Sequence, residues 1–544
     1  MFISKESAEN LDLDFVFDKL TVYTPYGENL KKNIRPFRKE EKEQLNEELN
    51  RIEKIVGLIK RQRYTVIEIR NYFKHIKDLT LTFQRVKDDE VLSVIELYEI
   101  KLFVGILSKL YLSIQKLKWD DMPDDIKPMP IPEIENLLDP QKTGTTTFYI
   151  YDEYSEKLAS IRREIKEIEN KINIEKKKLK AKVEDELGLK LRPTGEIIIS
   201  KDKSELIEKL KSHDLLLYSM ETYMNVTFKL RCTEYIDEMT LKIQDLKELE
   251  EEEEFKVREY LSRKIKKYID IIEKNISAIG KLDLLMAKGY HAVGFGGVRP
   301  DISDKEGIYI LNGRHIKVEQ NLKKEGKEFT PITVNLKKGV TCITGANMGG
   351  KTVALKLIGM LSAMAQYGLF VPAEKMKFSL KEYIFFSLGD MQSTDMGLST
   401  FGGEIMKIKE AIKFSHKSGL ILIDELARGT NPKEGFAISK ALINYLKKKN
   451  AITVITTHFD GLTLDKDIKH LQVKGISEKK FEEISQKLLK GKIGTETLHH
   501  YMDYRLEEVD KAKEVPKDAI RISRLMGLDE EILKDAEKIL KDNE

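Results

Sequence analysis

An apolar stretch, a glycine-rich loop and a helix-forming stretch follow one another in the second half of the chain. The loop reads Gly345-Ala346-Asn347-Met348-Gly349-Gly350-Lys351-Thr352, and it lies between the apolar residues 341–344 and the helix expected over 353–365. Glycines let backbone N–H groups converge on phosphate oxygens at a helix N-terminus, where the helix dipole also favours an anion. Strand, loop and helix in this order are the context that a phosphate-binding P-loop requires.

Short apolar runs alternate with helix-like stretches from about residue 287 onward. The runs cover 332–334, 340–344, 420–423 and 452–455. Apolar strands that alternate with helices are typical of a parallel sheet with both faces covered. We therefore predict an α/β domain over 287–466.

Five polar side chains are expected to meet at one edge of this sheet. Lys351 should reach the β- and γ-phosphates of a nucleotide, and Thr352 should ligate Mg²⁺. Asp424 and Glu425 directly follow the run 420–423. The first of these acids is expected beside Mg²⁺, and the second can orient or deprotonate an attacking water. His458 follows the next strand and can contact the γ-phosphate or that water.

The part of the chain before the α/β region has the pattern of helices. Apolar residues recur at three- and four-residue spacing over 1–154, which predicts a helical domain. A charged segment then carries a narrow apolar stripe typical of a coiled-coil seam, formed by Leu158, Ile161, Ile165, Ile168, Ile172 and Leu179. A second stripe returns from Met239 to Ile279, so two long helices are expected to pair antiparallel within 155–286. The stretch 188–234 between them contains strand-like pieces and predicts a small domain at their tip.

Charge and cysteine content narrow the class of protein. With 94 basic and 91 acidic residues, the net charge of +3 neither requires nor excludes a nucleic-acid partner. Cys232 and Cys342 cannot build a disulfide framework, which fits a reducing compartment. No secretory signal is visible at the N-terminus, and the uncharged stretch 357–373 is too short and interrupted to span a bilayer. We expect a soluble, cytoplasmic protein without a membrane partner, and a polar helical tail over 467–544.

The motifs together resemble the ATPase of the MutS superfamily. The resemblance is carried, in this order and spacing, by residues 345–352, 398–401, 424–432 and 456–459. It implies ATP and Mg²⁺ as cofactors, ATP hydrolysis, and a homodimer in which Ser399 completes the nucleotide site of the partner subunit. It further implies that Gln392 belongs to the Q-loop and that Phe329 stacks on adenine.

The same resemblance implies a domain order. A core-like helical domain over 1–154 would be followed by lever helices over 155–286, with a reduced clamp at about 188–234. An ABC-type P-loop ATPase domain over 287–466 and a helical dimerisation region over 467–544 would complete the chain. Because it begins at the core and no Smr domain follows residue 544, the chain resembles a short MutS-like form. It would lack the mismatch-recognition and connector domains, so direct mismatch reading is not expected.

Two functions remain open at this point. The first is a DNA-engaging clamp for repair or recombination, which we prefer. Basic side chains at the tip could contact phosphate, and these are Lys201, Lys203, Lys209, Lys211, Lys229 and Arg231. They are interleaved with acids, so a plain solvated tip fits equally well. The second is a remodelling ATPase that reactivates a client enzyme, a cobalamin-dependent aminomutase, as some short MutS-like ATPases do.

Overall fold

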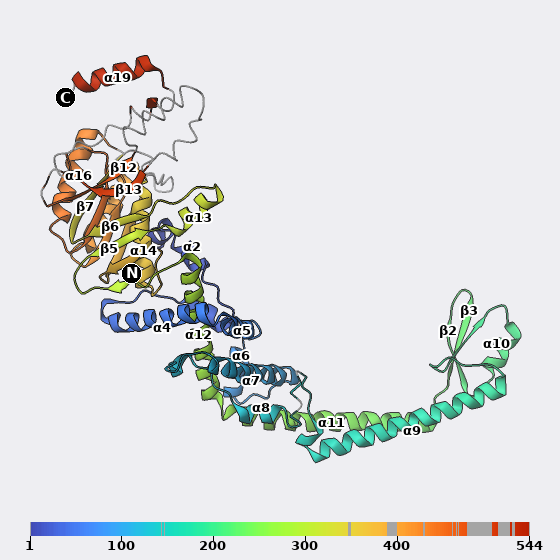
Figure 1. Ribbon diagram of the computed structural model, residues 1–544. Coiled ribbons are helices and arrows are strands. Elements are labelled where there is room, and N and C mark those ends of the chain that lie inside the picture. The colour runs from blue at the N-terminus through green and yellow to red at the C-terminus, as the bar shows by residue number, and fades with distance from the viewer. Residues whose placement is uncertain are drawn as a thin grey trace. The chain divides into compact units, whose positions relative to one another are not determined.

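The chain folds into two compact units, which are interleaved in sequence (Figure 1). The computed structural model describes residues 2–142, 144–145, 147–345, 350–388, 400–427, 430–459, 461–463, 465, 467–475, 503–509, 520, 523–524 and 528–542. The first unit comprises Met1–Lys74, Ser113–Lys127 and Ser277–Glu544, and the second comprises His75–Leu112 and Pro128–Ile276. Helices together with several sheets confirm the predicted class, α plus α/β. The predicted domain boundaries stay predictions.

A six-stranded sheet forms the centre of the first unit. In spatial order its strands are β13 (Asp503–Glu508), β12 (Lys469–Gly475), β7 (Gly339–Thr344), β11 (Ile452–Thr456), β10 (Gly419–Ile423) and β9 (Tyr383–Ser387). All neighbours are parallel except β13, which pairs antiparallel with β12 at the edge. Every residue of β10 and β11 is buried, as a sheet covered on both faces requires.

Helices cover both faces of this sheet. Ile421 and Ile423 pack with residues of α15 (Thr400–Phe414) and α16 (Pro432–Leu446) in one apolar cluster. The alternate residue Leu422 faces the other side, where it meets Gly359 of α14 (Lys351–Gln366). A Cβ on Gly359 would lie 2.5 Å from Leu11 and 2.8 Å from Leu422, so the N-terminal segment packs directly on the helix that follows the P-loop.

The strands β12 and β13 correct the prediction that 467–544 is helical. In the described part of that region, only the last stretch, α19 (Glu530–Asp542), is a long helix. Leu471 and Val473 are buried because β12 lies beside β7. The local sequence of the tail is polar and does not indicate that it pairs with a distant strand. Two strands of the described tail therefore extend the sheet.

A second, four-stranded sheet and short helices complete the first unit. The sheet has the order β4 (Asp301–Ile302), β8 (Lys375–Phe378), β5 (Ile308–Gly313) and β6 (Ile332–Leu336), and α13 (Ile316–Lys324) connects β5 to β6. The remaining elements are α1 (Lys5–Asn10), α2 (Leu13–Asp18), α3 (Pro25–Lys32), η1 (Lys39–Glu41), α4 (Lys42–Arg61), α5 (Arg63–Phe73) and η2 (Asp124–Ile126). In α4, the predicted apolar face is buried at Leu45, Leu49, Ile52 and Ile55.

The second unit is built on a pair of long helices, α9 (Glu156–Leu187) and α11 (Glu234–Lys266), which lie side by side (Figure 1). Their shared apolar seam contains Ile161, Ile165, Ile168, Ile172, Ile236 and Leu246. At one end of the pair lies an antiparallel sheet of β1 (Glu196–Ser200), β3 (Asn225–Leu230) and β2 (Leu216–Glu221), with α10 (Ser204–Lys211). The other helices are α6 (Thr80–Lys87), α7 (Val94–Gln115), α8 (Pro132–Leu138) and η3 (Asp152–Tyr154). The helix after α11 is α12 (Ile269–Phe295), which ends in the first unit.

In the described part of the chain, no helix combines the length and apolar character that crossing a bilayer requires.

Candidate nucleotide-binding site

The predicted site residues follow three strands that are neighbours in the sheet. Strand β11 pairs with β7 on one side and with β10 on the other, and all three are parallel. The residues after these strands therefore leave the same edge of the sheet. Gly345 follows β7, Asp424 and Glu425 follow β10, and His458 lies two residues beyond β11.

Asp424 lies at the centre of a hydrogen-bonded group. The Thr352 hydroxyl donates to Asp424 Oδ2 over 2.8 Å, and the Thr456 hydroxyl donates to Asp424 Oδ1 over 2.7 Å. Burial raises the pKa of this carboxyl, and the hydrogen bonds from Thr456 and Thr352 offset only part of that effect. A buried carboxylate beside a hydroxyl offers the oxygen ligands that Mg²⁺ prefers, and the cation would supply the missing charge compensation.

Lys351, His458 and Glu425 form a second chain of contacts. The buried Lys351 ammonium donates to the Gly345 carbonyl over 2.7 Å and lies 3.3 Å from His458 Nε2. His458 Nε2 also lies 2.9 Å from Glu425 Oε1. The role of Nε2 depends on the tautomer of the ring. A protonated Nε2 donates to Glu425, and an unprotonated Nε2 accepts from Lys351.

The backbone is strained where it leaves β10. Glu425 and Ala427 have φ angles of 49° and 59°, the left-handed region that non-glycine residues seldom occupy. The Glu425 N–H donates to the Thr456 hydroxyl over 2.7 Å, so Thr456 links both acids to the next strand. Such strain is often held at functional sites, where surrounding contacts fix one geometry. Thr456 is a positioning residue to which the sequence motif assigned no role.

Tyr504 is a second residue that the sequence did not single out. It lies on β13, and its ring is so close to the P-loop that a Cβ on Gly350 would come within 3.0 Å of Tyr504 Cδ1. Burial raises the pKa of the Tyr504 hydroxyl, while the charge of Lys327 lowers it. Nothing in the local sequence marks this tyrosine, because only the pairing of β13 with β12 places it there.

The remaining predicted residues divide into two groups. Ala346, Asn347, Met348, Gly349, Gln392 and Ser399 lie outside the described residues. Phe329 is half-buried in the loop between α13 and β6. Its proposed stacking on adenine therefore stays a prediction.

The mainly parallel sheet, the helices that cover it and the separate helical unit define a multidomain protein of the α plus α/β class. Residues 341–544 match the family model for MutS domain V. The chain is 31% identical over 320 residues to a protein named Endonuclease MutS2 from Halothermothrix orenii, a match that covers 58% of this chain and 39% of that protein. A protein of the same name from Agathobacter rectalis is 34% identical over 306 residues, which are 55% of this chain and 36% of that protein. These matches support membership of the MutS superfamily, and the chain spans well under half the length of these relatives.

Proposed function

We propose that the protein is a cytoplasmic, homodimeric switch that binds and hydrolyses ATP and engages DNA in repair or recombination. The observation that carries the proposal is the 2.8 Å hydrogen bond between Thr352 and Asp424. Glu425 is the residue that follows Asp424. This hydrogen bond joins the first helical turn after the P-loop to the acids after β10, as a site for a nucleotide and its metal ion requires. The names of the relatives support a role connected with DNA.

Each side chain then has a distinct task. Lys351 neutralises phosphate charge, and Thr352 and Asp424 would hold Mg²⁺. An ion held there would offset the negative charge of the phosphate oxygens. Glu425 orients the attacking water and accepts its proton, and His458 holds the Glu425 carboxylate through the 2.9 Å contact.

Two variants with different expected defects test the hydrolytic assignment. Lys351→Ala should lose tight ATP binding, whereas Glu425→Gln should bind ATP and hydrolyse it about 100-fold more slowly or worse, the usual effect of losing a general base. The exposed neighbours Lys433→Ala and Glu434→Gln are matched controls. ATP hydrolysis by Glu425→Gln at the parental rate would falsify the catalytic role.

The tip of the second unit would provide the contact with DNA, through only some of its basic residues. Lys201 pairs with Glu221, Lys211 with Glu208 and Lys229 with Glu196, at 2.5, 2.9 and 3.1 Å. These three lysines already have a carboxylate partner. Within the described residues, no ion pair holds the exposed side chains of Lys203, Lys209 and Arg231, which are therefore the proposed phosphate contacts.

The surface of the same tip favours a second candidate function. Five large apolar or aromatic side chains are exposed on and beside the β2–β3 hairpin: Leu217 by 44%, Tyr218 by 49%, Met220 by 57%, Tyr223 by 95% and Met224 by 68%. Contiguous apolar surface usually marks a protein contact rather than a phosphate backbone. A remodelling ATPase that pulls on a client enzyme, such as a cobalamin-dependent aminomutase, would use this hairpin.

A further inference from the structure

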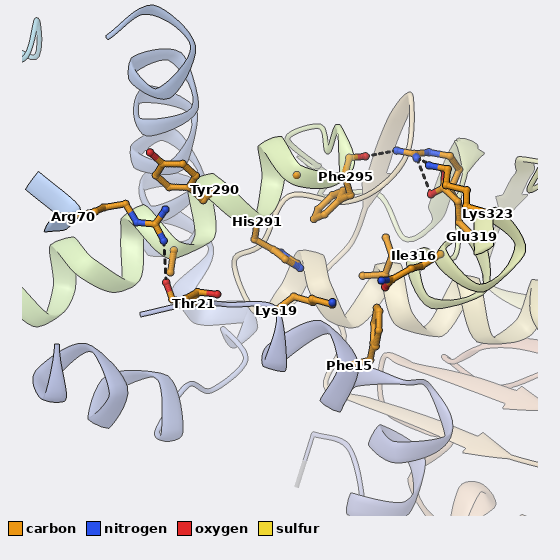
Figure 2. Close-up of a pocket in the computed structure, with 14 residues that line it drawn as sticks. Phe15, Lys19, Thr21, Arg70, Tyr290, His291, Phe295, Ile316, Glu319 and Lys323 are labelled. Atoms are coloured by element: carbon orange, nitrogen blue, oxygen red, sulfur yellow. Dashed lines mark hydrogen bonds and ion pairs between the residues drawn. The ribbon is translucent and has the colours of Figure 1, made fainter. Parts of the chain in front are cut away.

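A cavity of about 560 Å³ lies within the first unit and shares no lining residue with the P-loop site (Figure 2). Four segments line it. They are α2 and the residues after it, α5, the C-terminal end of α12, and α13 with the preceding Arg314. Its volume falls within the roughly 300–1,000 Å³ of ordinary small-molecule sites.

The lining carries more positive than negative charge. Lys19 and Arg70 have no carboxylate at ion-pair distance among the described residues, and Arg70 instead lies 3.8 Å over the Tyr290 ring. Arg314 donates to both oxygens of Glu319 over 2.9 and 2.8 Å, and Lys323 pairs with the same carboxylate at 2.9 Å. The lining thus contains four cationic side chains and one carboxylate. This imbalance favours an anionic ligand.

His291 adds a buried polar atom without a partner. The residue is only 8% exposed, and its Nε2 has no hydrogen-bond partner in the described structure. Its ring lies between Phe295 and Lys19 and faces the cavity (Figure 2). Buried polar groups are rarely left unpaired, because the loss of hydration is not compensated. A ligand with a hydrogen-bonding edge would satisfy this atom.

Aromatic rings line the cavity beside these polar groups. Phe295 packs edge-to-face on His291, with ring centroids 4.7 Å apart at 77°. The Lys19 ammonium lies 5.2 Å over the Phe15 ring, on the side of Ile316 (Figure 2). Flat apolar walls next to a cation suit a molecule that carries both a ring and a negative charge.

We propose that this cavity binds a small phosphorylated molecule with a flat ring, of the nucleoside monophosphate kind. Its phosphate pairs with Lys19, its ring lies against Phe15 and Phe295, and its edge hydrogen-bonds to His291 Nε2. The site is separate from the P-loop.

Calorimetric titration of the full chain carrying Lys351→Ala, which removes the P-loop contribution, tests the proposal. The probes are adenosine 5′-monophosphate, guanosine 5′-monophosphate, their unphosphorylated nucleosides and inorganic phosphate. At least one monophosphate should bind, and its nucleoside and phosphate alone should each bind about 10-fold more weakly or worse. The reason is that each lacks one of the two recognised groups. Binding of inorganic phosphate as tightly as either monophosphate would overturn the proposal.

Two further variants in the same background locate the binding. Lys19→Gln should weaken it about 10-fold, the loss expected for one charge-assisted contact. Gly294→Leu should abolish it without removing a charge, because no atom lies within 4 Å of a Cβ built on this lining residue and the new side chain enters the cavity. Exposed Lys60→Gln and Arg61→Gln on α4 are the controls, and thermal unfolding shows that each variant folds. No binding of either monophosphate, or equal binding by Gly294→Leu, would show that the cavity is not such a site.

Discussion

The ring of Tyr504 lies against the P-loop at Gly350, so close that a Cβ on this glycine would come within 3.0 Å of Tyr504 Cδ1. Gly350 also has a φ angle of 83°, a left-handed conformation that glycine adopts without strain. An antiparallel edge strand from the C-terminal region therefore forms one wall of the candidate nucleotide site. We infer that the Tyr504 ring also stacks on the base of the bound nucleotide, in addition to the contact predicted for Phe329.

Tyr504→Ala should weaken ATP binding about 10-fold, within the range for loss of one base–aromatic stack, and Tyr504→Phe should retain affinity. Fluorescence titration with an ATP analogue measures both. Tyr64→Ala, at a tyrosine that is 90% exposed, is the control. If Tyr504→Phe binds the ATP analogue as weakly as Tyr504→Ala does, the hydroxyl rather than the ring is important for binding, and stacking is the wrong explanation.

Mixing two inactive variants tests catalysis across the proposed dimer. Ser399→Arg and Lys351→Ala should each lack ATPase activity alone. A mixed dimer keeps one site of two with an intact P-loop and an intact Ser399. Random exchange makes half of the dimers mixed, so activity should reappear on equimolar mixing, up to about a quarter of the parental rate. Subunit exchange is checked with differently labelled chains. Without recovery in samples that have exchanged, Ser399 does not act in trans.

Neutralising the unpaired basic residues at the tip separates the two functional candidates. For a DNA clamp, Lys203→Gln, Lys209→Gln and Arg231→Gln together should reduce DNA affinity and also the slope of affinity against salt, because fewer counterions are released. The paired Lys201, Lys211 and Lys229, changed in the same way, should have a smaller effect. Binding is measured by fluorescence anisotropy at low salt with perfect, mismatched and branched duplexes.

The result expected for a protein client is different. DNA binding would then be absent or unchanged by either triple substitution. Met220→Ser with Tyr223→Ser should instead reduce the ATPase response to an inactivated aminomutase. Loss of DNA binding on the first triple substitution alone would argue against the client hypothesis.

Stability should fall as the pH is lowered below neutrality, because two histidines are buried in the neutral form. Burial lowers the pKa of His315 and of His291 to about 4, from 6.5 when exposed. Between about pH 6.5 and 4 the unfolded chain therefore binds more protons than the folded chain. The free energy of unfolding should fall in this window by up to about 1.4 kcal/mol per pH unit for each histidine.

Urea denaturation at several pH values measures this slope. His315→Gln should make it shallower, since a glutamine cannot titrate, whereas the exposed His416→Gln should leave it unchanged. An unchanged slope in His315→Gln would mean that His315 is not held neutral. The Gln variant is compared by its slope alone, so a lower overall stability does not affect the conclusion.

Much of the candidate site could be predicted from the sequence, because its signals are local. The apolar runs before Gly345, Asp424 and His458 are strands since they are buried on both faces, and a burial pattern of this kind is written in consecutive residues. The glycine-rich loop likewise combines its glycines, Lys351 and Thr352 in one segment. The apolar stripe of α9 also predicted its buried seam.

Other features depend on contacts between segments far apart in the chain, which no local pattern records. The run of glutamates 250–254 reads as a solvated helix face, yet Arg162 of α9 donates to Glu250 and Glu254 over 2.7 and 2.6 Å. Thr456 contacts Asp424 only because β11 lies beside β10, and Tyr504 reaches Gly350 only because β13 closes the edge of the sheet. The sequence alone thus determined which residues are candidates for phosphate chemistry, through local spacing and burial. Only the tertiary structure decided which distant side chains hold, shield and surround them, because strand order and helix pairing arise from the packing of the whole unit.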